Sequence, residues 1–568
     1  MLSLLEVTAL FGGAQGISDP ETAIARAADV SDVQEVDAAE LERYEALLRR
    51  PLPINRVGEV RLEDAGLFSA YQIAALADYR IRCGDILSAT ELAQVDGFTR
   101  ERAKALRPFL DFSPREAESK ERWKPSGELV WKPQKWKTHL ELGNTLELSY
   151  SPSGSRNLSL SGGGSRLQWQ LTLGDYRARF GQGLLLWNGF STSGVTTLGG
   201  FARTGASGVV PSRSWSEGTA LRGAAGQLHF GRWRASVFAA GGYAKDAGPL
   251  LVGAGLSRTF RNGQLGLTGY RKGLERAPDG TALRDGELKL SADFFWNRRG
   301  REYFGEAAFD ALKRQTAFVG GLRWPLGGEG MRLALTGRYY PAAYGAPYAA
   351  ALRAGSKTAD ETGLALGWEW GSPYKLKLTL IGDAALQGLG GEKRKRQLKL
   401  FQELGWQLDP AWRLELRATE RFRDGAYTGT NGRGRAELRT DVKWARGPWR
   451  QNLRLDAVRC VRTGFLSYIE QGYDDAKYRL WLRETFFFAD RWADRVYAYE
   501  RDAPGGFSVP AFYGRGLKLA ALGGWKLRLL QKRLRLSLYG RASAQFYPFR
   551  GYQKKTRTDA RVQVQLTF

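Results

Sequence analysis

Cysteine and histidine are nearly absent from this chain of 568 residues, which contains two of each. Cys83 and Cys460 lie far apart in the sequence, so they provide neither a disulfide framework nor a CxxC metal knuckle. His139 and His229 are too few for a zinc site of the usual composition or for a histidine-based triad. The sequence also shows no GxSxG motif and no paired-carboxylate arrangement. It therefore predicts no metal, no cofactor and no enzymatic activity, and it disfavours a membrane-embedded hydrolase.

The chain also lacks long hydrophobic runs and contains fewer acidic than basic residues. No stretch approaches the ~18 consecutive apolar residues that a membrane-spanning helix needs, so an integral membrane protein would have to use strands. Asp and Glu number 59 against 85 Lys and Arg, which gives a formal net charge of +26. This excess favours an anionic partner, such as nucleic acid, lipopolysaccharide or phospholipid headgroups. A general arginine bias on water-facing surfaces is the alternative.

From Trp136 onward the sequence alternates apolar and polar residues. In the last stretch, Thr558 to Phe568, every second residue is apolar, and Leu534, Leu536 and Leu538 alternate with polar residues in the same way. This is the pattern of a strand with one apolar and one polar face. Strands of about 9–12 residues have the length needed to cross the hydrocarbon layer at a tilt. The prediction is a mainly β protein, with a large transmembrane antiparallel β-barrel over residues 136–568.

The connections between these strands alternate in length. Short turns, such as Arg261–Gly263 and Ala489–Arg491, are followed by longer polar loops, such as Pro341–Asp360 and Asp424–Gly432. Short periplasmic turns and long external loops are typical of outer-membrane barrels, whereas a β-sandwich has no reason to keep this rhythm. Pairing strands by this rule predicts about 20–22 strands. Tryptophans near strand ends, among them Trp406 and Trp444, are candidates for the aromatic girdles at the two membrane interfaces.

The chain ends on the aromatic residue Phe568. This ending resembles the C-terminal signature by which bacterial outer-membrane β-barrels are recognised for insertion. The resemblance implies that Phe568 is a membrane-insertion signal and that the barrel assembly machinery is a partner. It also implies that outer-membrane lipid and lipopolysaccharide surround the barrel.

Between residues 49 and 112 the pattern changes to helical spacing and forms two similar units. Each unit has two helices joined by a tight turn, and Gly66 and Gly97 stand where such a turn needs a positive φ. The stretch resembles the tandem helix-hairpin-helix domain of competence DNA receptors, with its lead-in PLPIN, its helix AYQIAALADYR and its closing LRPFL.

That family binds nucleic-acid phosphates through hairpin N–H groups at the start of the second helix, aided by nearby cations, so binding is independent of sequence and sensitive to salt. Ser69 and Thr99 replace the usual second hairpin glycine, and Glu63 and Asp64 flank the first hairpin. A rigid periplasmic domain that docks to a protein therefore stays open as the alternative. The residues that the resemblance implies for phosphate or DNA binding are Gly66, Leu67, Ser69, Gly97, Phe98, Thr99, Arg100 and Lys104.

Three segments complete the layout. Residues 1–16 are similar to the apolar core and small-residue end of a secretory signal, and an amphipathic helix is the alternative. Residues 17–48 are rich in Ala, Glu and Asp and predict an amphipathic helical segment. Prolines at 51 and 53 end this segment. Residues 113–135 are charged and contain proline, which predicts a linker into the barrel.

One connection differs in style. Leu173–Phe190 leads into a run rich in Gly, Ser and Thr. Together with the helical domain, this layout resembles Bacteroidetes outer-membrane proteins that carry a helix-hairpin-helix domain before a barrel. One interpretation is an inward-folded constriction loop in the lumen; a strand with a bulge followed by an external loop is the other. The polar residues that would form the constriction are Tyr176, Arg177, Arg179 and Gln182.

The leading functional hypothesis is an outer-membrane barrel whose periplasmic helix-hairpin-helix domain binds DNA or another polyanion without sequence preference, in uptake or transport. The second hypothesis is a transport or assembly component whose helical domain docks to a periplasmic protein. Cations converging around the second hairpin would favour the first, and an exposed apolar patch around Tyr71, Ile73 and Leu76 would favour the second.

Overall fold

The computed structural model describes residues 19–115, 125–143, 145–164, 166–188, 194–203, 205, 208–215, 218, 220–244, 247–273, 275–276, 282–284, 286–327, 330–391, 394–424, 434–529, 534–547 and 556–568. The signal-like segment 1–16 lies outside these residues, as do part of the predicted linker and part of the loop Asp424–Gly432. Among the described residues, no helix is long and apolar enough to cross a membrane.

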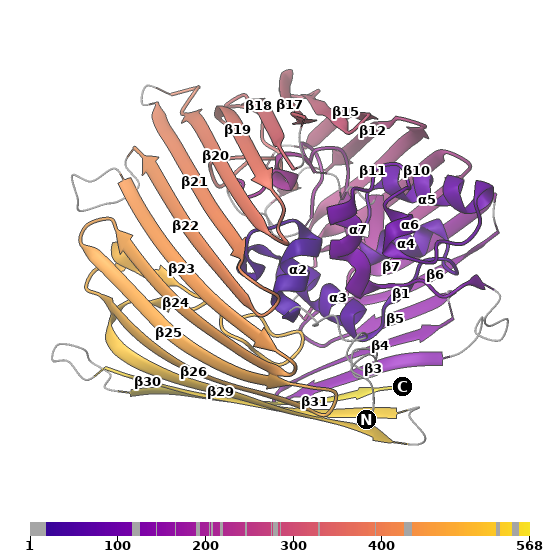
Figure 1. Ribbon diagram of the computed structural model, residues 1–568. Coiled ribbons are helices and arrows are strands. Elements are labelled where there is room, and N and C mark those ends of the chain that lie inside the picture. Colours follow the sequence, from indigo (N-terminus) through magenta and orange to yellow (C-terminus); the bar gives the residue numbers. More distant parts are fainter. Residues whose placement is uncertain are drawn as a thin grey trace.

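Twenty-four antiparallel strands close into one barrel, which confirms the predicted fold class (Figure 1). The short β8 (Gly208–Pro211) pairs only with the end of β7 and stands outside this ring. The strands are β3 (Pro125–Lys132), β4 (Lys135–Leu142), β5 (Leu146–Tyr150), β6 (Arg156–Gly163), β7 (Leu167–Arg179), β9 (Leu221–Phe230), β10 (Trp233–Tyr243), β11 (Ala247–Phe260), β12 (Gly263–Lys272), β15 (Glu287–Arg298), β16 (Arg301–Asp310), β17 (Gln315–Pro325), β18 (Arg332–Tyr340), β19 (Glu361–Gly371), β20 (Leu376–Gln387), β21 (Lys395–Gln407), β22 (Trp412–Arg423), β23 (Gly434–Arg446), β24 (Trp449–Arg459), β25 (Thr463–Asp474), β26 (Tyr478–Ala489), β29 (Gly514–Leu529), β30 (Leu534–Phe546) and β31 (Thr556–Thr567).

The expected number of strands, about 20–22, was too low because the first strands are shorter than a spanning strand. β3 has eight residues and β5 only five, against the roughly 9–11 that cross the hydrocarbon layer. β3 begins at Pro125, within the range expected to be a linker. The pairing of β3 with the last strand, β31, closes the ring.

The strand faces follow the alternation of the sequence. In the middle of β12, Leu267 is 61% exposed on the outer surface, whereas its neighbour Thr268 is 5% exposed and points inward. Large apolar side chains are exposed in this way on strands around the ring. In a closed barrel every backbone polar group of the wall can be paired, and an apolar outer surface suits lipid. The barrel is therefore built as an outer-membrane barrel.

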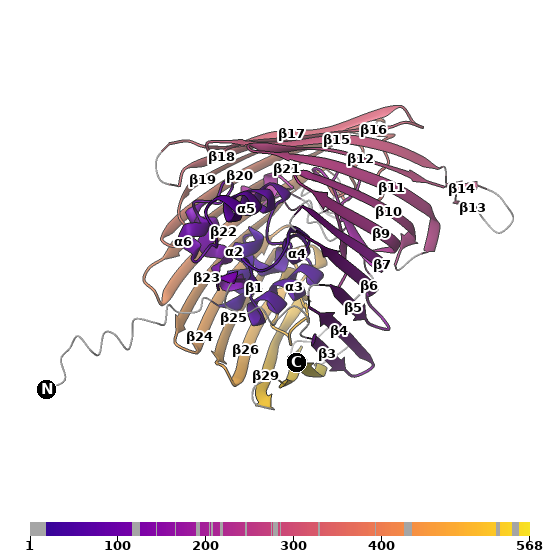
Figure 2. The same cartoon turned by 90° about the vertical axis from the view of Figure 1, so that its right-hand side faces the viewer.

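The two ends of the barrel differ. At one end, here the short-turn end, tight turns such as Arg261–Asn262 and Arg299–Gly300 join the strands, and the chain terminates at Phe568. The other end, the long-loop end, carries the long connections. The expected short turn at Ala489–Arg491 is wrong, because β26 ends there at the long-loop end and opens a connection of η6 (Trp492–Asp494), β27 (Val496–Tyr497) and β28 (Ala511–Phe512) that reaches β29. β13 (Glu275–Arg276) and β14 (Ala282–Arg284) also lie at this end (Figure 2).

The N-terminal helices lie inside the barrel, near the short-turn end (Figures 1 and 2). We call the described residues 19–115 the helical plug. Its elements are α2 (Pro20–Ala28), η1 (Val33–Glu35), α3 (Ala38–Arg49), β1 (Leu52–Pro53), α4 (Glu59–Ala65), α5 (Ala70–Arg82), α6 (Ala89–Leu92), α7 (Arg100–Leu106), η2 (Arg107–Phe109) and β2 (Leu110–Asp111).

Candidate functional site

The helical plug has a hydrophobic core of its own. The buried members of this core all lie between Ala23 and Leu110. Among the described residues outside the plug, only the partly buried Tyr499 and Phe507 pack against it. Because α2 and α3 contribute Ile24, Leu41 and Tyr44, the core spans both the predicted segment 17–48 and the predicted domain 49–112. The plug is thus built as a separate folding unit within the lumen.

Ion pairs, by contrast, join the plug to the wall. Glu63 of α4 accepts a hydrogen bond of 2.9 Å from Arg234 of β10 and lies 3.2 Å from a ring nitrogen of His229 in β9. The next residue, Asp64, accepts a hydrogen bond of 2.9 Å from the Gln170 amide in β7. Both carboxylates that flank the first hairpin therefore have partners on the barrel wall.

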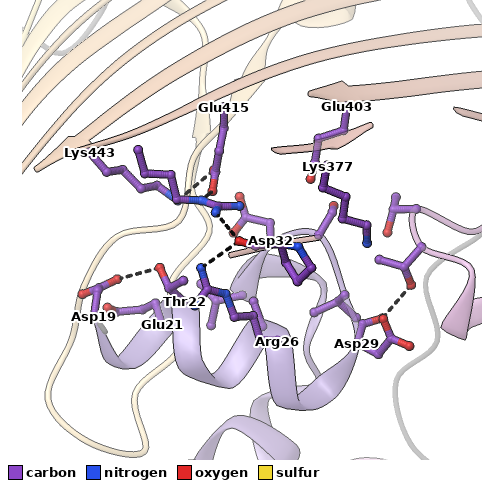
Figure 3. Close-up of a pocket in the computed structure, with 18 of the residues that line it drawn as sticks. Asp19, Glu21, Thr22, Arg26, Asp29, Asp32, Lys377, Glu403, Glu415 and Lys443 are labelled. Atoms are coloured by element: carbon purple, nitrogen blue, oxygen red, sulfur yellow. Dashed lines mark hydrogen bonds and ion pairs between the residues drawn. The ribbon is translucent and has the colours of Figure 1, made fainter. Parts of the chain in front are cut away.

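A second set of pairs surrounds Asp32, at the start of η1. Its carboxylate lies 2.5 Å from Arg439 of β23, 3.5 Å from Arg454 of β24 and 3.9 Å from Arg417 of β22. Burial alone would raise the pKa of Asp32, but the charges of Arg439, Arg417 and Lys443 outweigh it and lower the pKa. A cavity of about 190 Å³ lies beside this cluster, between α2 and the wall, and charged side chains from both line it (Figure 3).

The long-loop end also contributes to this contact. Arg501, in the connection that follows β26, pairs with Asp19 at 3.2 Å and with Glu21 of α2. Its Nε donates a hydrogen bond of 2.7 Å to Glu470 of β25. Arg501 therefore links the plug, a loop and the wall in one network.

The four predicted constriction residues lie close to one another in the lumen. Tyr176 is fully buried and donates a hydrogen bond of 3.0 Å to the Ala239 carbonyl. Arg177 pairs with Asp37 of the plug at 3.2 Å, and Arg179 pairs with Glu40 at 2.6 Å. Gln182 donates its backbone N–H to Glu306 of the wall at 2.7 Å.

The chain that follows these residues folds inward. The backbone N–H of Trp187 donates to the Tyr348 carbonyl at 2.8 Å, and that of Ala350 donates to the Gly183 carbonyl at 3.0 Å. The described residues of two long connections, after β7 and after β18, thereby pack together in the lumen beside the plug.

Two carboxyl groups of the plug have displaced pKa values. Burial alone would raise the pKa of Glu40, but Arg179 and two further arginines outweigh it and lower the pKa to about 2. Burial, together with the nearby carboxylate of Glu147, raises the pKa of Asp64 to about 7. The attachment of the plug is therefore expected to depend on pH, through Glu40 below about pH 4.5 and through Asp64 between about pH 3.8 and 7.

The first hairpin is enclosed within the lumen. Gly66 ends α4 with a φ of 62°, and the Arg43 guanidinium packs where a side chain on Gly66 would stand. Leu67 is buried, and its carbonyl accepts a hydrogen bond of 2.7 Å from Arg102. Ser69 caps α5 through a reciprocal pair of hydrogen bonds with Gln72.

The second hairpin lies at the short-turn end. The Gly97 carbonyl accepts a hydrogen bond of 2.7 Å from Gln72, and Phe98 is buried in the plug core. The Thr99 hydroxyl accepts from the N–H of Arg102 and so caps α7. Thr99 and Arg100 are exposed. Lys104 lies over the ring of Tyr374, in the turn between β19 and β20, with its Nζ 3.8 Å from the ring centroid.

One cluster in the described part of the chain has the composition of a metal site. His139, Glu141 and Glu147 bring their ligand atoms within 4.8 Å of one another on β4 and β5. Arg61 of the plug already lies 3.0 Å from Glu141, and Arg213 forms hydrogen bonds with Glu147. Two guanidinium groups thus hold these carboxylates in place, so the residues fit an ion-pair cluster better than a metal site.

Phe568 takes part in closing the barrel. Its backbone N–H donates to the Gly127 carbonyl at 3.0 Å, and its carbonyl accepts from the Gly127 N–H at the same distance. The last residue therefore continues the pairing of the last strand with the first.

None of the protein-family models matches this chain, and none of the curated proteins does. Among solved structures, a chain of the E. coli P pilus tip assembly intermediate PapC-PapD-PapK-PapG aligns over 81% of this chain and 63% of its own length, with 9% identity and a TM-score of 0.41. The copper transporter OprC aligns over 80% and 82%, with 10% identity and a TM-score of 0.39. The siderophore receptor PirA from Pseudomonas aeruginosa aligns over 79% and 81%, with 10% identity and a TM-score of 0.38. The chain spans less than two thirds of the first of these, and similarity this distant carries no functional argument, so the function has to be derived from the chain's own residues.

Proposed function

We propose that this chain is an outer-membrane transporter or receptor whose lumen is closed by the helical plug and opens when the plug is displaced. The observation that carries the proposal is the contrast between the core and the contact surface of the plug. The apolar core lies within residues 23–110, whereas ion pairs such as Glu63 with Arg234 and Asp32 with Arg439 attach the plug to the wall.

Such a contact surface suits a part that moves. An apolar core shared with the wall would have to be exposed to water if the plug moved, at about 25 cal/mol for each Å². Separated charges can instead be hydrated, and their solvation offsets much of the lost attraction. The plug can therefore leave the wall while its own core keeps it folded.

The accessible face of the plug supports a partner on the same side. Short turns of outer-membrane barrels face the periplasm, and α5 lies against that rim, where Tyr71 donates a hydrogen bond of 3.2 Å to the Arg261 carbonyl. At and beyond the end of α5, Ile81 is 82% exposed and Leu87 is 58% exposed. The patch expected at Tyr71, Ile73 and Leu76 is buried, so Ile81 and Leu87 are the aliphatic side chains that this proposal offers to a partner. We propose that a periplasmic protein docks here and releases the plug, while Tyr176, Arg177, Arg179 and Gln182 form a second constriction toward the exterior.

Conductance across planar bilayers tests the proposal with the full chain. We expect the wild-type channel to be closed and the triple variant Asp32→Asn, Glu40→Gln, Glu63→Gln to show open events. A control with Asp78→Asn, Asp96→Asn and Glu101→Gln changes the charge by the same amount at more exposed plug positions and should stay closed.

A reversible cross-link between the plug and the wall distinguishes openings caused by plug release from openings caused by general damage to the barrel. In a Cys83→Ser, Cys460→Ser, Asp32→Asn, Glu40→Gln background, Glu63→Cys and Arg234→Cys joined by a bifunctional thiol reagent should keep the channel closed. Reduction of a cleavable reagent should restore openings. A triple variant that stays closed, or an opening that the cross-link does not prevent, would contradict the proposal.

The second candidate function is binding of DNA or another polyanion at the second hairpin. The exposure of Thr99, Arg100, Lys104 and Arg107 at the short-turn end favours it. Fluorescence anisotropy of labelled duplex DNA with the full chain in detergent, at two salt concentrations, tests it. Binding should fall steeply with salt, with a log–log slope of about 0.9 per neutralised phosphate. Arg100→Glu with Lys104→Glu should abolish binding, whereas Arg82→Glu should have little effect; equal binding by all variants would rule out this hairpin.

A further inference from the structure

The barrel wall is lower where its first strand, β3, meets its last strand, β31. β3, β4 and β6 have eight residues each and β5 has five, whereas β30 and β31 have thirteen and twelve. β3 pairs with β31 only from Glu128 opposite Thr567 to Trp131 opposite Val564. β30, on the other side of β31, pairs along its whole length up to Thr556. The short strands therefore leave a notch in the wall toward the long-loop end.

One side of this notch is the edge of β31. Among the described residues, no strand pairs with Thr556–Gln563 on the side away from β30. Residues 556–562 are all exposed, so the alternation of buried and exposed residues seen on other strands is missing here. Both faces of this half of β31 are thus open.

The hydrogen-bond pattern shows which backbone groups point into the notch. Phe568 and Gly127 exchange both backbone hydrogen bonds across the seam. In an antiparallel strand, alternate residues direct N–H and C=O to the same neighbour. Because β31 pairs with β30 without a register shift, Thr556, Thr558, Ala560 and Val562 direct their backbone groups into the notch.

Unpaired backbone groups are costly at this position. Each one that lacks a partner in the hydrocarbon layer costs several kcal/mol. Acyl chains offer no donor or acceptor, whereas another strand offers both at the right spacing. An open strand edge is a template for such addition.

The side chains around the notch define the strand that would fit. On the luminal side, Lys132 and Lys135 of the β3–β4 hairpin and Arg557 and Arg561 of β31 carry positive charge. Asp559 and Asp502, the latter in the connection before β29, each lie 3.0 Å from Arg561, so the charge offered to an incoming strand is mainly that of the two lysines and Arg557. On the outer side, Trp131, Trp136 and Tyr150 are exposed, with the rings of Trp136 and Tyr150 5.3 Å apart.

We propose that the notch is a docking site for an extended segment of another polypeptide, which adds to the edge of β31 as a further strand. Its inward residues would be acidic, to match the lysines and arginines, and its outward residues would be apolar, to face lipid and the exposed aromatic rings. The plug reaches this seam outside the notch, where Arg49 lies 3.1 Å from Glu128 of β3 and donates a hydrogen bond of 3.5 Å to Gln565 of β31, so strand addition does not require the plug to move.

The test uses the full chain in detergent and a fluorescent eight-residue peptide that alternates Glu with Leu or Val. An isomer with the same residues in two blocks is the control. Ala560→Pro removes one N–H that points into the notch and keeps the hydrogen bonds to β30, since proline is tolerated on strand edges. We expect it to weaken binding of the alternating peptide at least tenfold, while Ala560→Val stays within twofold.

Two further measurements keep the outcome clear. Unchanged heat-modifiable mobility of Ala560→Pro would show that the barrel still forms. Hydrogen exchange should show slower exchange of the Thr558, Ala560 and Val562 amides when the alternating peptide is present. Equal binding of both peptides, or full binding to Ala560→Pro, would overturn the proposal.

Lipid is the competing occupant, and it gives a different result. A fluorophore at Arg561→Cys, in the Cys83→Ser, Cys460→Ser background, can be compared with one at the outward Val237→Cys in vesicles of brominated phosphatidylglycerol. Weak quenching at position 561 is expected. Quenching as strong as at position 237, and unaffected by the peptide, would show that lipid fills the notch and would overturn the proposal.

Discussion

The Oε1 atom of Glu63, in a helix of the plug, lies 2.9 Å from the Nη1 atom of Arg234 in the barrel wall, and the exposed fractions of these side chains are 2% and 8%. Removing one partner of a buried pair leaves an uncompensated charge and costs about 3–5 kcal/mol. Glu63→Gln should therefore weaken plug attachment by about that amount. Hydrogen exchange of the Val60 amide, whose N–H donates to Gln168 of the wall at 3.4 Å, measures the effect. Asp78→Asn, which breaks a more exposed pair with Arg232, should change it by about 1 kcal/mol or less.

Acid should release the plug through carboxylates with lowered pKa values. The folded pKa of Glu40 is about 2, below the ordinary value of 4.5. Its contribution is present above the unfolded pKa and is lost as the pH falls from about 4.5 through about 2. Channel conductance should rise over this range, and Glu40→Gln should make the channel less dependent on pH there. An unchanged acid response in Glu40→Gln would assign the effect to other carboxylates.

A rise in pH toward neutrality should also weaken the attachment of the plug, through Asp64. Its folded pKa of about 7 lies above the ordinary value of 3.8. The stability it contributes is complete below about pH 3.8 and is lost as the pH rises through about 7. The Val60 amide, which donates to Gln168 of the wall, should therefore exchange faster at pH 8 than at pH 6, after correction for the intrinsic pH dependence of exchange. Asp64→Asn should remove this difference; a difference that persists would contradict the assignment.

Leu536 and Arg535 should respond differently to a change of polarity. The alternation of β30 places Leu536 on the lipid side, whereas Arg535 lines a cavity between the plug and the wall. A cation at the bilayer midplane costs about 2–4 kcal/mol. Leu536→Arg should reduce the amount of heat-modifiable barrel in the membrane, and Arg535→Leu should leave it near the wild-type level. Equal tolerance of both changes would contradict the orientation of the wall.

Deletion of Phe568 should slow insertion of the barrel. The deletion removes both backbone hydrogen bonds with Gly127 and the aromatic terminus. The rate at which heat-modifiable barrel appears measures the effect. Phe568→Tyr keeps the hydrogen bonds and the ring, so it should insert at the wild-type rate. Insertion of the deletion variant at that same rate would show that the terminus carries no signal.

The barrel was predictable because alternation is a local property. Each strand shows one apolar face within about ten residues, as Leu534, Leu536 and Leu538 do. The short β5 was not recognised from the sequence, because five residues contain too few alternations to distinguish a strand from a loop. The length of the connection after Ala489 was not predicted, because its inward course depends on residues distant in sequence, such as Asp19, which pairs with Arg501.

The position of the helices in the lumen was not predictable from local pattern. Glu63 and Arg234 are far apart in sequence, and a carboxylate on a helix has the same appearance whether it faces water or a buried arginine. A usable signal was present in the charge distribution, because residues 17–48 are acidic although the whole chain has a net charge of +26. Opposite charge on two parts of one chain favours their contact.

The pairing of plug carboxylates with luminal arginines also determines what an open pore would conduct. With the plug in place, Asp32 balances Arg439 and Arg454, and Asp19 and Glu21 balance Arg501. Once the plug leaves, these guanidinium groups stay on the wall and its connecting loops with Asp441 and Glu470 as partners, but they lose the carboxylates that the plug supplied. Rings of fixed cations lower the energy of anions in a pore and raise that of cations. The same residues that hold the channel shut would thus make it anion-selective when open.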